Sequence, residues 1–100
     1  MTVLLTERQT PEGLLVTVCD ADVVGETFED GSVSLTVEAD FYAEDAREAD
    51  AEAVVDSLAR AMTANIVGVR SVGIAIEHGF VEEGNVLDLE GTRHAQYLRL

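Results

Sequence analysis

The order of hydrophobic patterns along the chain constrains its fold more than any other feature. Segments typical of strands stand at both ends, and a block with helical periodicity lies between them. Strands are expected at residues 2–6 and 14–18, joined by a turn that contains Pro11 and Gly13. This order predicts an α+β fold, a two-layer sandwich in which two helices pack on one face of a mainly antiparallel sheet.

The remaining strands follow from alternation and turn residues. A helical turn is expected at residues 21–25 and a hairpin turn at residues 30–31. The next strand, residues 32–39, has the clearest alternation, with these side chains on its apolar face: Val33, Leu35, Val37 and Ala39. Two strands are expected at residues 86–90 and 96–100, after a turn at residues 82–85. Their inward side chains are predicted to be Leu87, Leu89, Leu98 and Leu100.

The first helix is predicted over residues 44–62. Its apolar stripe has the i, i+3, i+4 spacing of a helix face and consists of Val54, Val55, Leu58, Ala61 and Met62. Asp45 followed by Glu48 resembles a capping box, and Asp50 is an equally good start. The sequence leaves both starting points open.

The second helix is predicted over residues 66–78. Asn65 stands where an N-cap would be, and Gly79 where a left-handed residue would end the helix. Gly68 would allow close packing of the backbone. On this interpretation, residues 63–72 form the break between two core helices.

Composition indicates a single folded domain, residues 1–100, that works at high salt. The apolar fraction is 47%, as in a chain with a hydrophobic core. Asp and Glu number 20 and Lys is absent, which leaves a net charge of −14. Such a charge repels itself in dilute buffer, but at about 1 M salt the Debye length is only about 3 Å. We therefore expect the cytosol of a halophilic archaeon, and acidity says little about partners.

The compartment is expected to be a reducing cytoplasm. A single cysteine, Cys19, cannot form an intramolecular disulfide. The first ten residues lack the basic and apolar regions of a signal peptide. Residues 57–76 carry no acid and are about as long as a membrane span, but they include two arginines and an asparagine. No membrane association is expected.

Motifs for catalysis or cofactors are absent from the sequence. It has no P-loop, no dinucleotide-binding glycine pattern and no paired cysteines or histidines for zinc, so neither a cofactor nor a metal is expected. An enzyme would have to combine isolated residues. Cys19 with a histidine, and Asn65 or Asp20 as orienting residue, is the one such combination. A thiol of this kind needs a lowered pKa, and a lone buried cysteine is usually a small apolar residue.

The distribution of acids is more informative than any motif. Residues 57–76 and 91–100 contain no acid. In a chain that acidifies its exposed surface, such segments are either buried or kept for a partner. Burial does not easily explain Arg70 and Arg93, because charged residues are rarely buried unpaired. We therefore predict a polar, locally cationic face, with these candidate residues: Arg70, Arg93, His94, Gln96, Asn65 and Tyr42.

Several short motifs together resemble one family. They are "VCD", "VVGETF", "FY", "ANIVG", "HGF" and a late "HAQ", spread over nearly the whole chain. In this combination the chain is similar to the archaeal family called domain of unknown function 424. The resemblance implies an archaeal cytosolic protein with an α+β fold and attaches no reaction to it. The family's pattern falls on Cys19, Asp20, Gly25, Phe28, Phe41, Tyr42, Asn65, Gly68, His94 and Gln96.

Three hypotheses about function remain open at this stage. The first is a non-enzymatic module that docks RNA or a ribonucleoprotein of the translation apparatus, with arginine on phosphate and Tyr42 or His94 stacked on a base. The second is a pocket between sheet and helices for a small ligand or for catalysis, built from Cys19, Asp20, Asn65 and His94. The third is a homo-oligomeric or purely structural protein.

Overall fold

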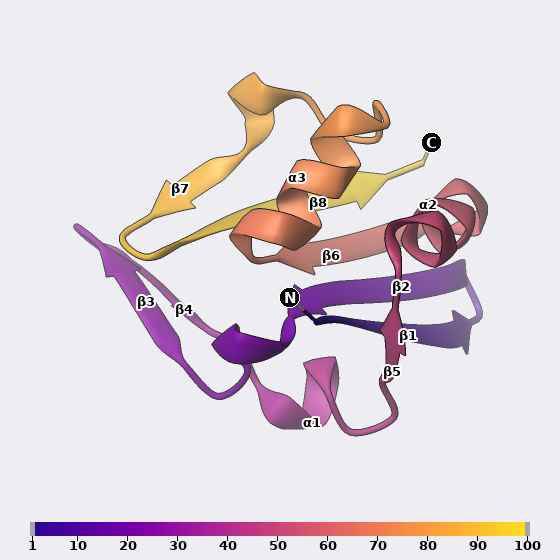
Figure 1. Cartoon of the computed structure of the whole chain (residues 1–100), viewed down its shortest axis with the longest axis horizontal. Coiled ribbons are helices and arrows are strands. Elements are labelled where there is room, and N and C mark those ends of the chain that lie inside the picture. Colours follow the sequence, from indigo (N-terminus) through magenta and orange to yellow (C-terminus); the bar gives the residue numbers. More distant parts are fainter. Residues whose placement is uncertain (1, 100) are drawn as a thin grey trace.

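The computed structural model describes residues 2–99 and, within them, a six-stranded sheet, a separate two-stranded hairpin and three α-helices (Figure 1). The strands are β1 (Val3–Thr10), β2 (Gly13–Asp20), β3 (Thr27–Asp30), β4 (Val33–Thr36), β5 (Arg47–Ala49), β6 (Thr63–Val67), β7 (Leu87–Leu89) and β8 (Thr92–Leu98). The α-helices are α1 (Ala39–Tyr42), α2 (Ala51–Arg60) and α3 (Val69–Glu77), and 3₁₀ turns cover Ala21–Val23 and Glu83–Asn85. No helix of the described chain is long and apolar enough to span a membrane.

The large sheet is mostly antiparallel, and the mixed α+β fold is confirmed. Its strand order is β5-β1-β2-β6-β8-β7. The pair β2–β6 is parallel and the other four pairs are antiparallel. The carboxyl ends of β2 and β6 therefore meet at the same edge, and α3 starts directly after β6.

Helices α2 and α3 cover one face of this sheet, which we call the helix face, and both lie in front of strands in Figure 1. Alternate strand residues point to it, among them Leu5, Val18 and Ile66. They form one buried cluster with residues of both helices: Val54, Leu58, Val72 and Ala75. This cluster is the main hydrophobic core.

The opposite side of the sheet, the second face, is partly covered as well. Cys19 and Val67 alternate with the helix-face residues and belong to a separate apolar cluster. Leu4 of β1 also packs against it, and its other members come from α1 and from the segments in and around the β3–β4 hairpin: Val23, Val24, Phe28, Leu35, Val37, Phe41 and Tyr42. The predicted two-layer sandwich is therefore not confirmed, because short elements pack on both sides of the sheet.

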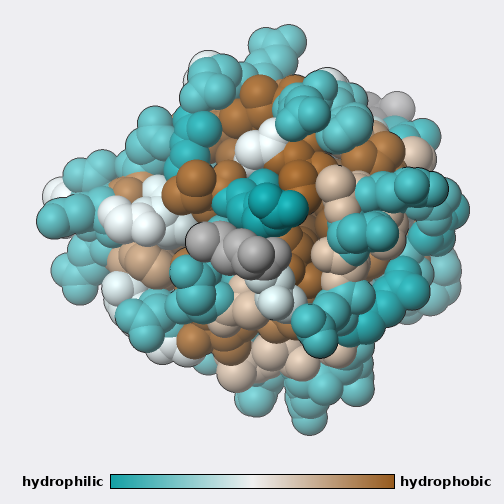
Figure 2. All heavy atoms as spheres, in the orientation of Figure 1, coloured by the Kyte–Doolittle hydropathy of each residue, from teal (hydrophilic) through white to brown (hydrophobic). Residues whose placement is uncertain are grey.

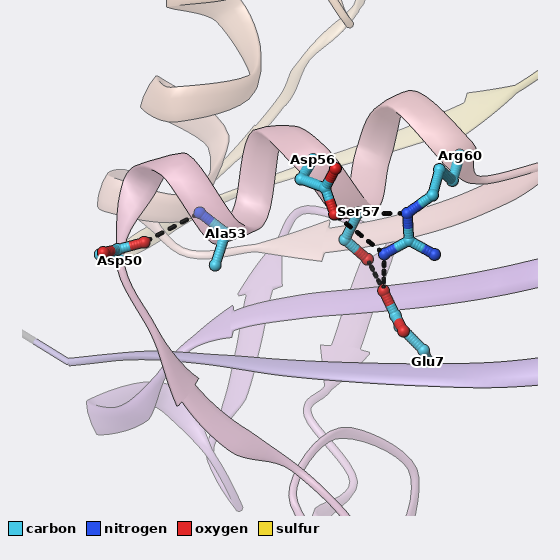
Figure 3. A network of polar contacts seen from close by, with 6 residues as sticks. All are labelled: Glu7, Asp50, Ala53, Asp56, Ser57 and Arg60. Atoms are coloured by element: carbon cyan, nitrogen blue, oxygen red, sulfur yellow. Dashed lines mark hydrogen bonds and ion pairs between the residues drawn. The ribbon is translucent and has the colours of Figure 1, made fainter.

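The start of α2 is at Asp50, one of the two starting points left open by the sequence. Its carboxylate accepts a hydrogen bond from the Ala53 amide at 2.8 Å (Figure 3). One turn before its end, α2 is joined to β1: the Glu7 carboxylate accepts from the Ser57 hydroxyl at 2.6 Å and from Arg60 at 2.5 Å. These contacts orient α2 across the sheet.

The predicted continuous helix over residues 44–62 is wrong. Residues Arg47–Ala49 form the edge strand β5, which pairs with the first half of β1. Asp50 still has extended backbone angles, so the strand ends and the helix begins at the same residue. The capping box at Asp45 and Glu48 therefore does not form, because Glu48 lies in the strand opposite Leu4.

Asn65 is also not the N-cap of a helix. It lies in the middle of β6, whose apolar residues fit a helix period as well as a strand, and pairing with β2 and β8 selects the strand. The N-cap position of α3 is Gly68, with φ of 120°. The predicted end of this helix is confirmed, since Gly79 has φ of 79° directly after the C-cap His78.

The turns predicted before residue 40 are confirmed, but several side chains that were predicted to face the core do not. Residues 10–13 and 30–33 are hairpin turns, yet β4 ends at Thr36 and lies in the small hairpin, where Val33 is exposed. Of the C-terminal leucines Leu89 is buried, whereas Leu87 and Leu98 are exposed. Leu100 lies outside the described residues.

Candidate functional site

A row of polar side chains crosses the second face of the sheet. Cross-strand pairing places Thr6 of β1 opposite Thr17 of β2, Thr17 opposite Asn65 of β6, and Asn65 opposite Gln96 of β8. Paired residues point to the same face, so the four side chains form one line. The two threonines are buried, Asn65 is half-buried and Gln96 is exposed. The row therefore emerges to solvent at β6 and β8.

At its exposed end the row forms an amide pair beside a histidine. The Gln96 Nε2 donates a hydrogen bond to the Asn65 Oδ1 at 3.0 Å. His94 lies two residues before Gln96 on the same face of β8, and its Nδ1 is 3.2 Å from the Ile66 carbonyl oxygen. Burial lowers the pKa of His94 below its ordinary value, and the hydrogen bond to Ile66 only partly opposes this shift. We call Asn65, His94 and Gln96 the amide–histidine site.

The second face of the four central strands carries no acid. Glu48 on the edge strand β5, opposite Leu4, and Asp40 in α1 mark its margin. In a chain with 20 acids, this is a strong local departure from the composition. The side chains of this face are Leu4, Thr6, Arg8, Thr10, Leu15, Thr17, Cys19, Thr63, Asn65, Val67, Thr92, His94, Gln96 and Leu98.

Arg8 joins this face to α1 and was not among the residues predicted from the sequence. Its guanidinium donates to the carbonyl oxygens of Phe41 at 2.7 Å and Asp40 at 3.4 Å, and lies 4.8 Å from the centre of the Phe41 ring. The Arg8 Nη1 and the hydroxyls of Thr6 and Thr17 are buried without a hydrogen-bond partner among residues 2–99. The strand predicted over residues 2–6 ends before Arg8. Extending the in–out alternation of that strand by two residues would have placed Arg8 on the same face as Thr6.

Neither predicted arginine lies in the amide–histidine site. Arg93 alternates with His94 and so points to the helix face, where it forms ion pairs with Glu83 and, at 2.7 Å, with Asp88. Hydrogen bonds to these two carboxylates hold the pKa of the Arg93 guanidinium above its ordinary value. The charge of Arg93 is thus already balanced within the chain.

Arg70 lies in the first turn of α3, on the helix side of the molecule. Its exposed side chain lines two adjoining hollows, of about 330 and 480 Å³, that share Ala51 and Ile74. Figure 2 shows this side, where apolar residues surround a hydrophilic group near the centre and most other hydrophilic side chains lie around the rim. The cationic face predicted from Arg70, Arg93 and His94 is therefore divided between opposite sides of the sheet.

Tyr42 is buried in α1 and presents no ring to a partner. Its side chain is 6% exposed and packs edge-on against Phe41, with ring centres 5.1 Å apart. Burial, with a smaller contribution from Cys19 nearby, raises the pKa of Tyr42 to about 12. The "FY" pair thus anchors α1 on the second face.

The alternative pocket is not assembled around a reactive thiol. Cys19 is fully buried on the second face, and burial, with a smaller effect of Asp20, raises the pKa of its thiol to about 11. His94 lies two strands away from Cys19, on the cross-strand line through Val67, at about 10 Å from the spacing of strands. As neighbours on one strand, Cys19 and Asp20 point to opposite faces.

Asp20 caps the N-terminus of α3. Its buried carboxylate accepts hydrogen bonds from the amides of Arg70 at 3.0 Å and Ser71 at 2.8 Å, and from the Ser71 hydroxyl at 2.7 Å. It occupies the position at which a helix N-terminus would bind an anion. Across residues 2–99, no three His, Cys, Asp or Glu side chains converge to hold a metal ion.

Comparison with known proteins identifies a family and a fold. The family model DUF424, described as a protein of unknown function, matches residues 7–100. The crystal structure of an uncharacterized conserved protein from Methanopyrus kandleri, an archaeon, is similar over 100% of this chain and 96% of that one, with a TM-score of 0.76 and 21% identity. At this identity the likeness concerns the fold. No curated protein matches the chain.

Proposed function

For a chain that belongs to the DUF424 family, whose description assigns no activity, we propose a non-enzymatic docking module that binds single-stranded RNA of a ribonucleoprotein on the second face of its sheet. The residues in contact are those of the amide–histidine site. The observation that carries this proposal is the absence of acids from the second face of β1, β2, β6 and β8.

This observation favours RNA because of the charge of its backbone. Carboxylates repel phosphates, so a protein with a net charge of −14 has few surfaces that an RNA strand can approach. The part of the second face at β6 and β8 is one of them, where the Gln96 amide is exposed and the Asn65 amide and the His94 imidazole are half-buried. Such groups bind the edges of unpaired bases, the parts of RNA that carry sequence.

The two arginines expected to hold phosphate have a smaller role in this proposal. Arg93 is paired with two carboxylates and Arg70 lies on the helix side. Binding then depends on bases and ribose rather than on neutralised phosphates. The logarithm of the affinity should change little with the logarithm of salt concentration, instead of falling by about 0.7 for each phosphate contact.

The habitat belongs to the same proposal. Twenty acids without any lysine suit the cytoplasm of a halophilic archaeal cell. At about 1 M salt the repulsion between the acidic surface and RNA is screened beyond about 3 Å, so only acids in direct contact with the strand oppose binding. Short-range hydrogen bonds at the amide–histidine site would then determine the affinity.

The test measures fluorescence anisotropy of labelled single-stranded RNA of mixed sequence over a range of molar KCl concentrations. The wild-type protein should bind with a salt slope near zero, and the double variant Asn65→Ala with Gln96→Ala should bind at least about tenfold more weakly. Arg70→Ala, an exposed substitution on the other side, is the matched control and should bind like the wild type. No binding by the wild type, or a loss confined to Arg70→Ala, would contradict the proposal.

A further inference from the structure

The hydrogen bond of the amide pair leaves one NH₂ group and one carbonyl group unused. The Gln96 Nε2 donates to the Asn65 Oδ1, so the Asn65 Nδ2 and the Gln96 Oε1 remain available. The exposed end of the polar row therefore presents a donor beside an acceptor.

His94 adds a second acceptor in a fixed position. The Ile66 carbonyl can only accept, so the neutral ring carries its proton on Nδ1 and leaves Nε2 as an acceptor. His94 and Gln96 are two residues apart on one strand face, a separation of about 7 Å along the strand. The site thus offers two acceptors and one donor group on the surface between β6 and β8.

We infer that this site binds the edge of one unstacked base that carries an exocyclic amine, which means adenine, cytosine or guanine and excludes uracil. The inference rests on the proposed function and specifies its ligand. In adenine or cytosine the amine donates to the Gln96 Oε1 and the His94 Nε2, and the ring nitrogen accepts from the Asn65 Nδ2. In guanine the amine donates to the His94 Nε2, the ring N–H donates to the Gln96 Oε1, and the carbonyl oxygen accepts from the Asn65 Nδ2. Asparagine and glutamine bind adenine through two hydrogen bonds of this kind.

Uracil lacks this pattern. Its edge has one N–H between two carbonyl groups, so two acceptors of the base face a site that also consists mainly of acceptors. One polar group on each side is then left without a partner, and an unpaired group near a buried surface costs affinity. A preference of about tenfold for adenine or cytosine over uracil is expected.

The experiment compares short single-stranded oligomers of adenosine, cytidine and uridine with an abasic oligomer of the same length, by anisotropy at about 1 M KCl and at a pH well above the ordinary histidine pKa of about 6.5. Wild-type protein should bind the adenosine and cytidine oligomers about tenfold more tightly than the other two. Asn65→Asp keeps the hydrogen bond from Gln96 but replaces the free donor with an acceptor, so the preference should disappear.

Thr63→Ala, on the same strand and the same face as Asn65, is the matched control and should keep the preference. Thermal melting of each variant, followed by circular dichroism, verifies that it is folded. Equal binding of the three oligomers that carry bases, each tighter than the abasic one, would overturn the inference and leave RNA docking standing, whereas equal binding of the abasic oligomer would contradict both. An unchanged preference in Asn65→Asp, or a lost one in Thr63→Ala, would also overturn it. If wild-type protein binds none of them, the proposed function itself fails.

Discussion

The Asp20 carboxylate lies against the α-carbon of Gly68, so that a β-carbon at Gly68 would stand 2.3 Å from the Asp20 Cγ. The carboxylate reaches past this glycine to the first amides of α3. The end of β2 thereby caps the helix that follows β6, some 50 residues along the chain. Two positions that the family resemblance singled out are thus explained by the fold.

Gly68→Ala should lower the free energy of unfolding by about 3 kcal/mol, through an alanine strained at φ of 120° and the loss of the Asp20 cap. Unfolding by denaturant in molar KCl measures this change in the free energy of unfolding. Gly73→Ala is the matched control: this glycine lies inside α3 with open space around it, and alanine should stabilise the protein by about 0.5–1 kcal/mol. Equal effects of the two substitutions would contradict the proposed cap.

His94→Gln should remove part of the acid sensitivity of the fold. The folded state lowers the pKa of His94, so below about pH 6.5 the unfolded chain binds more protons and stability is lost as pH falls. The stability of the wild type relative to the variant should therefore fall on acidification through this range and stay constant above it. Unfolding midpoints measured across this pH range provide the test. If the difference in stability between wild type and variant is the same at all pH values, the folded state does not lower the pKa of His94.

Cys19 should react with thiol reagents only when the protein unfolds. A rise of its pKa from 9.0 to about 11 lowers the thiolate fraction at neutral pH by roughly a factor of 100, and the side chain is fully buried. Labelling with a maleimide in native buffer and in denaturant gives the ratio of rates. Fast labelling of the folded protein would show that the Cys19 thiol is accessible and reactive, as a catalytic nucleophile must be.

Glu7 and Ser57 should be energetically coupled. The hydrogen bond from Ser57, followed by the contacts with Arg60, lowers the pKa of Glu7 despite an opposing effect of burial. The contact therefore stabilises the fold above about pH 4.5, and this contribution is lost as pH falls through the lowered pKa. In a double-mutant cycle of Glu7→Gln and Ser57→Ala, the coupling at neutral pH should be below about 1 kcal/mol, because Glu7 is partly exposed. Strict additivity at neutral pH would show that the pair is not coupled.

The local features of this fold could be predicted because they depend on neighbours in the chain. The turn at residues 10–13, the hairpin at residues 30–31 and the end of α3 at Gly79 each need particular backbone angles that a few residue types supply. Asp50 caps α2 through an amide only three residues away. Such interactions are present in the sequence whatever the rest of the chain does.

Residues 63–67 show where local patterns stop being sufficient. Their apolar residues fit a helix, but hydrogen bonds to β2 and β8 make them the central strand β6. The same pairing brings Asn65 next to Gln96, 31 residues away, and sends Arg93 to the opposite face from His94. The sequence by itself determined the α+β class, the main turns and the separate acid-free segments. Only the tertiary structure decided which of those residues share a surface, because strand register depends on contacts between distant segments.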